Sequence, residues 1–355
     1  MPTTSRQWWK ATVPIFVGMA FHFLLCQPRV AGAQVAGMNT LAVLDLTTYG
    51  RTAALGLDYL PLFTDDPVAG LSNPSMLRQA MAGSVTASYV PLFRGSNMGS
   101  LGYIMHSKRL GTLSLGFHFV NYGRFAAYDE QGTPQGAFAA ADYALSVGWG
   151  MWLDSNFSFG AQMKPVLSQY ESYKALTVAF DVAASYTNTE RTLTATLMLR
   201  NIGAQLTTFD QKRERLPGEL SAEVSYKLKR APFRLFFALN ELSRWRLDYD
   251  DPLHPNSTVD PFSGEVTERG WLAATIDNAM RHAQAGVELN LGRSFFARVG
   301  YSYRQSAEMR GFDALNISGF SFGLGLRTRR FEVSYARRNY HLSQAPNHIT
   351  LCYRF

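Results

Sequence analysis

Apolar and polar side chains alternate, stretch after stretch, from about residue 84 to the end of the chain. In 112–119, four apolar residues interleave with Thr112, Ser114, Gly116 and His118. A period of two belongs to a β-strand with one apolar and one polar face. The alternation recurs at 145–151, 157–163, 176–182, 192–199, 220–227, 233–240, 284–291, 297–304, 320–327, 331–335 and 348–355. With weaker strands near 84–92 and 100–106, the pattern predicts about fourteen strands.

A soluble β-sandwich or a propeller would give the same alternation, so other features must decide. The polar faces carry Lys, Arg, Asp and Glu beside Gly and Ser, as a hydrated lumen would, and aromatic residues fall at strand ends. Short turns at 107–111, 153–156, 187–191, 228–232, 292–294 and 328–330 alternate with longer connections at 121–143, 200–217, 243–281 and 305–316. We therefore expect an all-β fold, a transmembrane antiparallel β-barrel of residues 84–355 in the outer membrane of a Gram-negative bacterium.

Residues 1–33 have the organisation of a signal peptide. Arg6 and Lys10 precede an apolar run at 11–26, and a small-residue pattern places cleavage between Ala33 and Gln34. An uncleaved anchor is disfavoured because the run is short for a membrane span, and a lipoprotein is disfavoured because Leu25 precedes Cys26. Removal leaves 31 basic and 27 acidic residues, a net charge of +4, which gives no indication of nucleic-acid binding.

The processed chain ends in Tyr353-Arg354-Phe355 and retains one cysteine, Cys352. An intrachain disulfide is therefore impossible. An aromatic last residue on an alternating strand resembles the C-terminal signal of outer-membrane insertion, although a chance aromatic end is the alternative.

Residues 34–83 break the strand pattern. Asp65-Asp66-Pro67 and Asn73-Pro74 are turn-forming combinations, and leucines are frequent between them. We expect a compact segment packed in the barrel lumen rather than a disordered tail, because the segment has apolar side chains to bury. Asp65, Asp66 and Asn73 either line a ligand path or cap turns of this segment.

The same segment resembles the FadL-like barrels. They share an Arg-x-Ala-x-x-Gly stretch, an acidic pair and an Asn-Pro-Ala element, represented here by 51–56 with Arg51 and Gly56, by Asp65-Asp66, and by Asn73-Pro74 with Ser75 replacing the alanine. Further stretches resemble the PorQ-like barrels of the type IX secretion system of Bacteroidetes. Among them are 119–125, 141–144, 199–205, 227–234, 247–252, 319–323, 334–336 and 340–341.

The resemblance implies a non-enzymatic component of a cell-surface attachment complex. Such a barrel would anchor a PorZ-like surface protein beside a PorU-type sortase and a PorV-type barrel, and would support cargo attachment to anionic lipopolysaccharide. One alternative is FadL-like transport of hydrophobic molecules, for which Pro165 marks either a lateral opening or simply a strand end. An enzymatic barrel is a third alternative. The family implies no catalytic residues and no cofactor.

The sequence contains few residue patterns typical of catalytic or metal sites. None of the six histidines after residue 33 forms a close metal-ligand pair, and no nucleophile elbow or phosphate loop occurs in context. His118 and His348 fall on lumen-facing positions. Asp248, Asp250 and Asp251 either bind a hard cation or form a solvated loop. The long connection 243–281 is predicted to dock a partner through four aromatic residues, Trp245, Tyr249, Phe262 and Trp271.

Overall fold

The computed structural model describes residues 41–93, 95–129, 131–209, 213–247, 257–259, 266–268, 270–292, 294–308, 318–339 and 345–355. The chain divides into Met1–Met38 and Asn39–Phe355, and all described residues belong to the second unit. The expected signal peptide, with its cleavage site between Ala33 and Gln34, lies outside the described residues.

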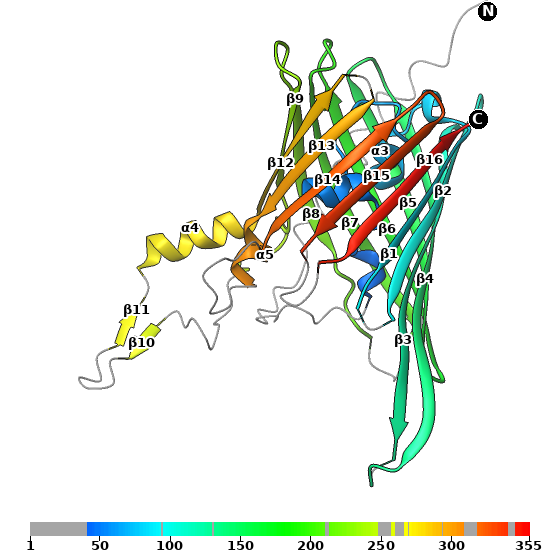
Figure 1. Cartoon of the computed structure of the whole chain (residues 1–355), viewed down its shortest axis with the longest axis vertical. Helices are drawn as coiled ribbons and strands as arrows, with labels where there is room; N and C mark the ends of the chain where they lie inside the picture. Colours follow the sequence, from blue (N-terminus) through cyan, green and yellow to red (C-terminus); the bar gives the residue numbers. More distant parts are fainter. Residues whose placement is uncertain are drawn as a thin grey trace, which may run out of the picture. The chain divides into compact units, whose positions relative to one another are not determined.

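Fourteen strands close into one antiparallel barrel, as the alternation predicts (Figure 1). They are β1 (Ser84–Pro91), β2 (Asn97–Ser107), β3 (Gly111–Tyr128), β4 (Pro134–Trp152), β5 (Phe157–Tyr170), β6 (Tyr173–Thr187), β7 (Leu193–Thr207), β8 (Glu219–Lys227), β9 (Phe233–Leu239), β12 (Ala283–Leu291), β13 (Phe295–Ser302), β14 (Phe320–Arg327), β15 (Phe331–Arg338) and β16 (Asn347–Arg354). Each strand pairs with its neighbours along the chain, and β1 pairs with β16 to close the ring. The long connection between β9 and β12 holds the small hairpin β10 (Ser257–Val259) and β11 (Val266–Glu268).

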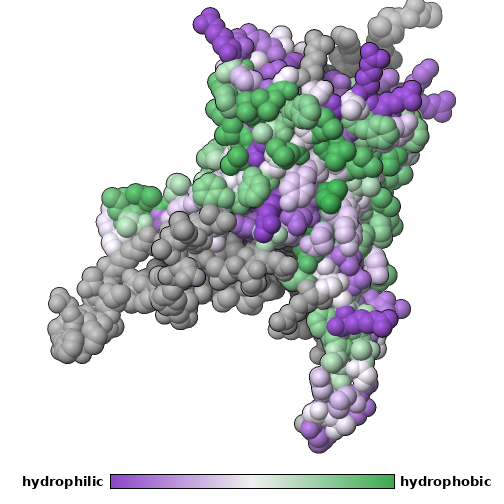
Figure 2. Space-filling view, in the orientation of Figure 1, coloured by the Kyte–Doolittle hydropathy of each residue, from purple (hydrophilic) through white to green (hydrophobic). Residues whose placement is uncertain are grey.

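The wall exposes its apolar face and buries its polar face, the reverse of a soluble sheet protein. In β14, Phe320, Phe322 and Leu324 are exposed, whereas Ser321 is buried. Figure 2 shows the resulting apolar surface as a green belt on the barrel wall. Closure satisfies the backbone hydrogen bonds that hydrocarbon cannot satisfy, so this arrangement is that of a transmembrane outer-membrane barrel rather than a sandwich or a propeller.

The predicted long connection 121–143 is wrong, because most of it is strand. β3 continues to Tyr128 and β4 begins at Pro134, so the hairpin extends beyond the rest of the barrel (Figure 1). A bulge between Asn121 and Gly123 shifts the register, and Phe125 stacks on Phe138 with ring centroids 5.4 Å apart. The alternation fades here because neither face of the hairpin has to meet lipid.

The described part of the expected N-terminal segment, residues 41–83, lies inside the barrel. Its elements are η1 (Ala42–Leu44), α2 (Gly50–Leu55), α3 (Pro67–Ser72), η2 (Pro74–Met76) and η3 (Gln79–Met81). We call residues 41–83 the luminal plug. Leu55, Leu57, Leu60, Met76 and Leu77 are fully buried in its main apolar cluster. Two helices, α4 (Trp271–Arg281) and α5 (Tyr303–Glu308), lie at the end with the long loops (Figure 1). Among the described residues, no helix is long and apolar enough to cross a bilayer.

Candidate functional site

Glycines in the wall let the luminal plug approach the strand backbones. Gly286, Gly300 and Gly323 face α2, and a Cβ atom built on Gly300 would overlap the backbone of Leu55. On the opposite side, a Cβ atom on Gly150 or Gly160 would overlap the backbone of Pro74 in η2. The Asn73-Pro74 element is therefore seated directly against the wall, and wall and plug have complementary shapes.

A buried ion-pair network joins α2 to the wall. Arg51 pairs with Asp66 at 2.5 Å and with Glu288 of β12 at 2.8 Å. Glu288 also accepts from Arg298 of β13 at 2.7 Å, and all of these side chains are nearly inaccessible to solvent. Breaking a buried ion pair leaves an uncompensated charge, so the network fixes the position of the plug.

The pKa of Asp66 reflects this network. Burial by itself would raise the pKa of the carboxyl group, but the positive charges of Arg51 and Arg327 outweigh burial and hold the pKa below its ordinary value. Asp66 also accepts from the backbone N–H of Val68 at 2.9 Å and so caps α3. The carboxylate of Asp66 thus caps the first turn of α3 and, through Arg51, ties α3 to α2.

The remaining residues of the FadL-like motif also stabilise the plug. Asn73 caps η2 by accepting from the backbone N–H of Ser75 at 3.1 Å and donates to Thr196 of β7 at 3.2 Å. Gly56 ends α2 in a left-handed conformation with φ of 69°, which favours glycine. Asp65 is half exposed and pairs with Arg78 at 3.3 Å. Asp66 and Asn73 therefore act as helix caps, and neither lines the cavity between the plug and the wall.

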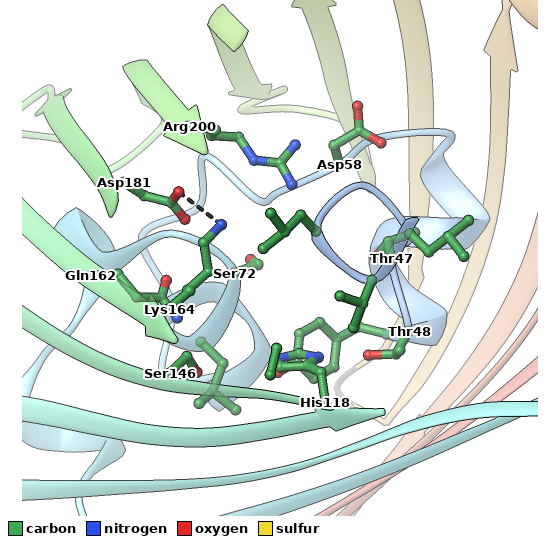
Figure 3. A pocket seen from close by; sticks show the side chains of 16 residues that line it. Thr47, Thr48, Asp58, Ser72, His118, Ser146, Gln162, Lys164, Asp181 and Arg200 are labelled. Atoms are coloured by element: carbon green, nitrogen blue, oxygen red, sulfur yellow. Dashed lines mark ion pairs between the residues drawn. The ribbon is translucent and has the colours of Figure 1, made fainter. Parts of the chain in front are cut away.

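A cavity of about 70 Å³ remains between the plug and strands β3 to β7 (Figure 3). Val43, Leu44 and Leu46 of the plug form an aliphatic part of its lining, and Leu71 and Ala144 extend it. The polar part of the lining consists of Thr47, Thr48, Tyr49, Asp58, Ser72, His118, Ser146, Gln162, Lys164, Asp181 and Arg200. A space of this size holds only a few water molecules.

Two cations line the cavity. Lys164 of β5 pairs with Asp181 of β6 at 2.7 Å and donates to Asn201 of β7 at 2.5 Å. Arg200 pairs with Glu219 at 3.4 Å, and Figure 3 shows Lys164 and Arg200 beside each other on the wall side. The alternation placed Lys164 and Asp181 on the luminal face.

Arg200 and Asn201 are adjacent in the chain, yet Arg200 lines the cavity and Asn201 is buried within reach of Lys164. The ladder between β6 and β7 shifts register between Phe180 and Val182, and Asn201 has a φ of 54°. A bulge of this kind re-aims side chains locally. The sequence pattern placed both residues in a connection at 200–217, whereas β7 continues to Thr207, so sequence reasoning missed this pair.

The wall beside the cavity has an interrupted ladder. β4 and β5 pair at Ala144 with Val166 and at Val147 with Met163, but the two intervening positions are unpaired. Pro165 lies in this interruption, and proline has no N–H to donate. On its other side, Pro165 pairs with Val178 of β6. The alternative that Pro165 marks a strand end is wrong, because β5 continues to Tyr170.

No group of three or more His, Cys, Asp or Glu side chains suited to a metal occurs within the described ranges. His118 lines the cavity and His348 is fully buried on the luminal face. Asp248, Asp250 and Asp251 lie outside the described residues.

The predicted partner loop and insertion signal lie at opposite ends of the barrel. Trp245 is exposed and stacks on His282, with centroids 5.3 Å apart, whereas Trp271 begins α4. Tyr249 and Phe262 lie outside the described residues. At the short-turn end, the ring of Phe355 packs edge-on against Tyr353 at 4.8 Å.

No protein-family model and no curated protein matches the sequence. Solved structures of outer-membrane barrels are similar to it. The Pseudomonas putida toluene transporter TodX is 12% identical over 87% of this chain and 97% of its own, with a TM-score of 0.47. A Pseudomonas aeruginosa FadL homologue is 11% identical over 88% and 99%, with a TM-score of 0.45. The KdgM porin is 9% identical over 77% and 99%, with a TM-score of 0.32.

Proposed function

We propose that this outer-membrane barrel conducts small, largely apolar molecules through its lumen, with the luminal plug as the closure and without catalysis. The observation that carries the proposal is the position of the cavity, because Ala144, Ser146 and Lys164 line it and also flank the interrupted β4–β5 ladder. Unpaired backbone within a membrane-spanning wall is tolerated where it borders a cavity. The interruption is therefore the exit that we assign to the transported molecule.

The lining suits a molecule with an apolar body and one polar end. Val43, Leu44 and Leu46 offer aliphatic contact, and Lys164 and Arg200 belong to the same lining. Because the cavity holds only about 70 Å³, a larger molecule enters by displacing the residues around η1.

Closing the interruption with a disulfide tests this path. Leu145→Cys with Pro165→Cys places thiols at the two outward-facing positions that do not pair. The matched control is Val147→Cys with Met163→Cys, which are paired in the same ladder two residues away. Both pairs are made with Cys352→Ser, and uptake of hydrophobic compounds is measured in a deletion strain before and after reduction.

We expect oxidation of the 145–165 pair to abolish uptake and reduction to restore it, while the 147–163 pair leaves uptake unchanged. Uptake that is indifferent to a formed 145–165 disulfide, or a deletion strain with normal uptake, would contradict the proposal.

A scaffold in a type IX attachment complex is the second candidate. Two observations favour it: the cavity beside the plug is only about 70 Å³, and the β3–β4 hairpin presents exposed Phe125 and Tyr128 beyond the barrel. In this role the barrel would hold a PorZ-like surface protein near a PorU/PorV-type sortase complex and anionic lipopolysaccharide, as the sequence resemblance implies. Exposed aromatic side chains are frequent anchors in protein interfaces.

Mild-detergent pull-down from outer membranes, with and without residues 250–268, separates the two candidates. Loss of co-purified surface proteins and of cargo attachment, with normal uptake, supports the scaffold. Loss of uptake with normal cargo attachment supports the channel.

A further inference from the structure

The helix α4 has its polarity reversed relative to an ordinary surface helix. Asp277 and Asn278 are its buried residues, and Arg281 is half-buried. Leu272 and Ile276, in contrast, are 56% and 55% exposed, and Trp271 is 78% exposed. A helix on a soluble protein places its apolar stripe towards the protein and its charges towards water. α4 does the opposite in its second half, and residues 271–276 are exposed except for the half-buried Ala274.

Hydrogen bonds of the buried face fix this orientation. Asn278 donates to the carbonyl of Trp245 at 2.5 Å and accepts from the backbone N–H of Leu247 at 2.8 Å. Asp277 accepts from Tyr303 of α5 at 2.6 Å and from Arg281 at 2.9 Å. Rotating the helix to bury its apolar stripe would leave these polar groups without partners, so the reversal is part of the fold.

The exposed face of α4 has almost no polar groups that could hydrogen-bond to water. Its side chains come from Trp271, Leu272, Ala273, Thr275, Ile276, Ala279 and Met280, and none of them is charged. The hydroxyl of Thr275 donates to the backbone carbonyl of Trp271 at 2.8 Å, so it is already bonded within the helix. Leu272, Ile276 and Met280 recur every four residues and form one continuous apolar stripe.

This stripe is continuous with the lipid-facing wall. The helix ends at Arg281 and the chain enters β12 at Ala283, where the outward-facing Ala285 and Val287 are exposed. In Figure 2 the green side chains of α4 lie on its upper side, towards the end of the barrel with the short turns and hence towards the apolar belt. The apolar face of α4 therefore points to where the bilayer surrounding the barrel begins.

We propose that α4 is an interfacial helix that lies on the membrane surface at the long-loop end, with its apolar face among lipid acyl chains. Trp271 lies at the level of the headgroups, the preferred depth of tryptophan. An amphipathic helix parallel to the bilayer binds through its buried apolar face. The helix thereby fixes the height and tilt of the β9–β12 connection above the membrane. This role does not depend on whether the barrel conducts molecules.

Site-specific fluorescence tests the assignment. An environment-sensitive dye is attached to Ile276→Cys in the full-length, Cys352→Ser protein reconstituted in phosphatidylcholine vesicles. Leu324→Cys, on the apolar wall of β14, is the lipid control, and Gln131→Cys, exposed at the tip of the β3–β4 hairpin, is the water control. Heat-dependent migration in SDS gels establishes that each variant is folded.

We expect the emission of the dye at position 276 to be blue-shifted relative to position 131 but less than at position 324, and its quenching by iodide to be several-fold weaker than at position 131. Lipids with a nitroxide near the headgroup should quench position 276 more than lipids with a nitroxide at the chain end. Iodide quenching equal to that at position 131 overturns the proposal. Protection that arises only after outer-membrane proteins are added also overturns it, in favour of a protein partner. The substitution alters one exposed side chain and spares the buried polar face, so the helix keeps its attachment.

Discussion

Arg51 in α2 and Glu288 in β12 lie 237 residues apart in the chain and are joined inside the barrel by an ion pair of 2.8 Å. Arg51 bonds Asp66 at the same time, and Glu288 bonds Arg298. The guanidinium group therefore links the plug to itself and to the wall. This position has the largest expected effect on how firmly the plug is held.

Replacing Arg51 with alanine should destabilise the protein by about 3–5 kcal/mol, because the Asp66 carboxylate stays buried without its cation. The free energy of unfolding in detergent micelles measures the effect. Lys229→Ala is the control, since Lys229 in the turn between β8 and β9 forms an exposed pair with Glu190 in the turn between β6 and β7. It should cause no measurable change, and equal losses in the two variants would contradict a special role for Arg51.

Acid should release the plug. Because the pKa of Asp66 is lowered in the folded protein, its contribution to stability is present above the ordinary carboxyl pKa. That contribution is lost as the pH falls through the lowered pKa of the folded state. Unfolding followed against pH should show this loss in the wild type, and Asp66→Asn should reduce the slope in the same acidic range. An unchanged slope would mean that Asp66 does not contribute through its charge.

Gly300→Ala should displace α2, because the added Cβ atom would overlap the backbone of Leu55. Overpacking of this kind costs about 1–3 kcal/mol. Gly218→Ala is the matched control, since its nearest neighbour, the carbonyl of Asn201, lies at an ordinary contact distance of 3.8 Å. Limited proteolysis of the plug in micelles reports the displacement. Equal protection in both variants would argue against tight seating of α2.

Phe355→Ala should reduce the amount of assembled barrel in cells without changing the stability of barrel that has already folded. The ring is 80% exposed and touches Tyr353, so it contributes little to the folded core. Heat-dependent migration of outer-membrane fractions measures assembly, and refolding of purified protein measures stability. Phe295→Ala, an exposed aromatic of β13, serves as the control. Normal assembly of Phe355→Ala would refute the insertion-signal interpretation.

The strands could be predicted from the sequence because lipid on one side and a polar lumen on the other force a period of two. That constraint ends where the hairpin leaves the membrane, which is why the strand residues around Phe125 and Phe138 were expected to be a loop. α4 left a readable signal, the spacing of Leu272, Ile276 and Met280, yet the direction of its apolar face depends on hydrogen bonds to Trp245 and Tyr303.

The presence of the plug was predictable from its turns and leucines, and its contacts were not. Which luminal carboxylate meets Arg51 depends on how β12 and β13 are placed around the ring. Likewise, the hydrogen bond from Lys164 to Asn201 depends on a bulge in the β6–β7 ladder that no local sequence pattern predicts.

The seam between β1 and β16 imposes an order of events on biogenesis. The plug is made first, yet α2 packs against β13 to β16, which are made last. The backbones of Leu55 and Pro74 lie so close to wall glycines that an added Cβ atom would overlap them, so we do not expect the plug to thread into a finished ring. We therefore expect residues 41–83 to be enclosed as the wall forms around them, with the pairing of β1 and β16 as the last step. A folding intermediate with an open seam would hold its plug loosely and remain accessible to proteases.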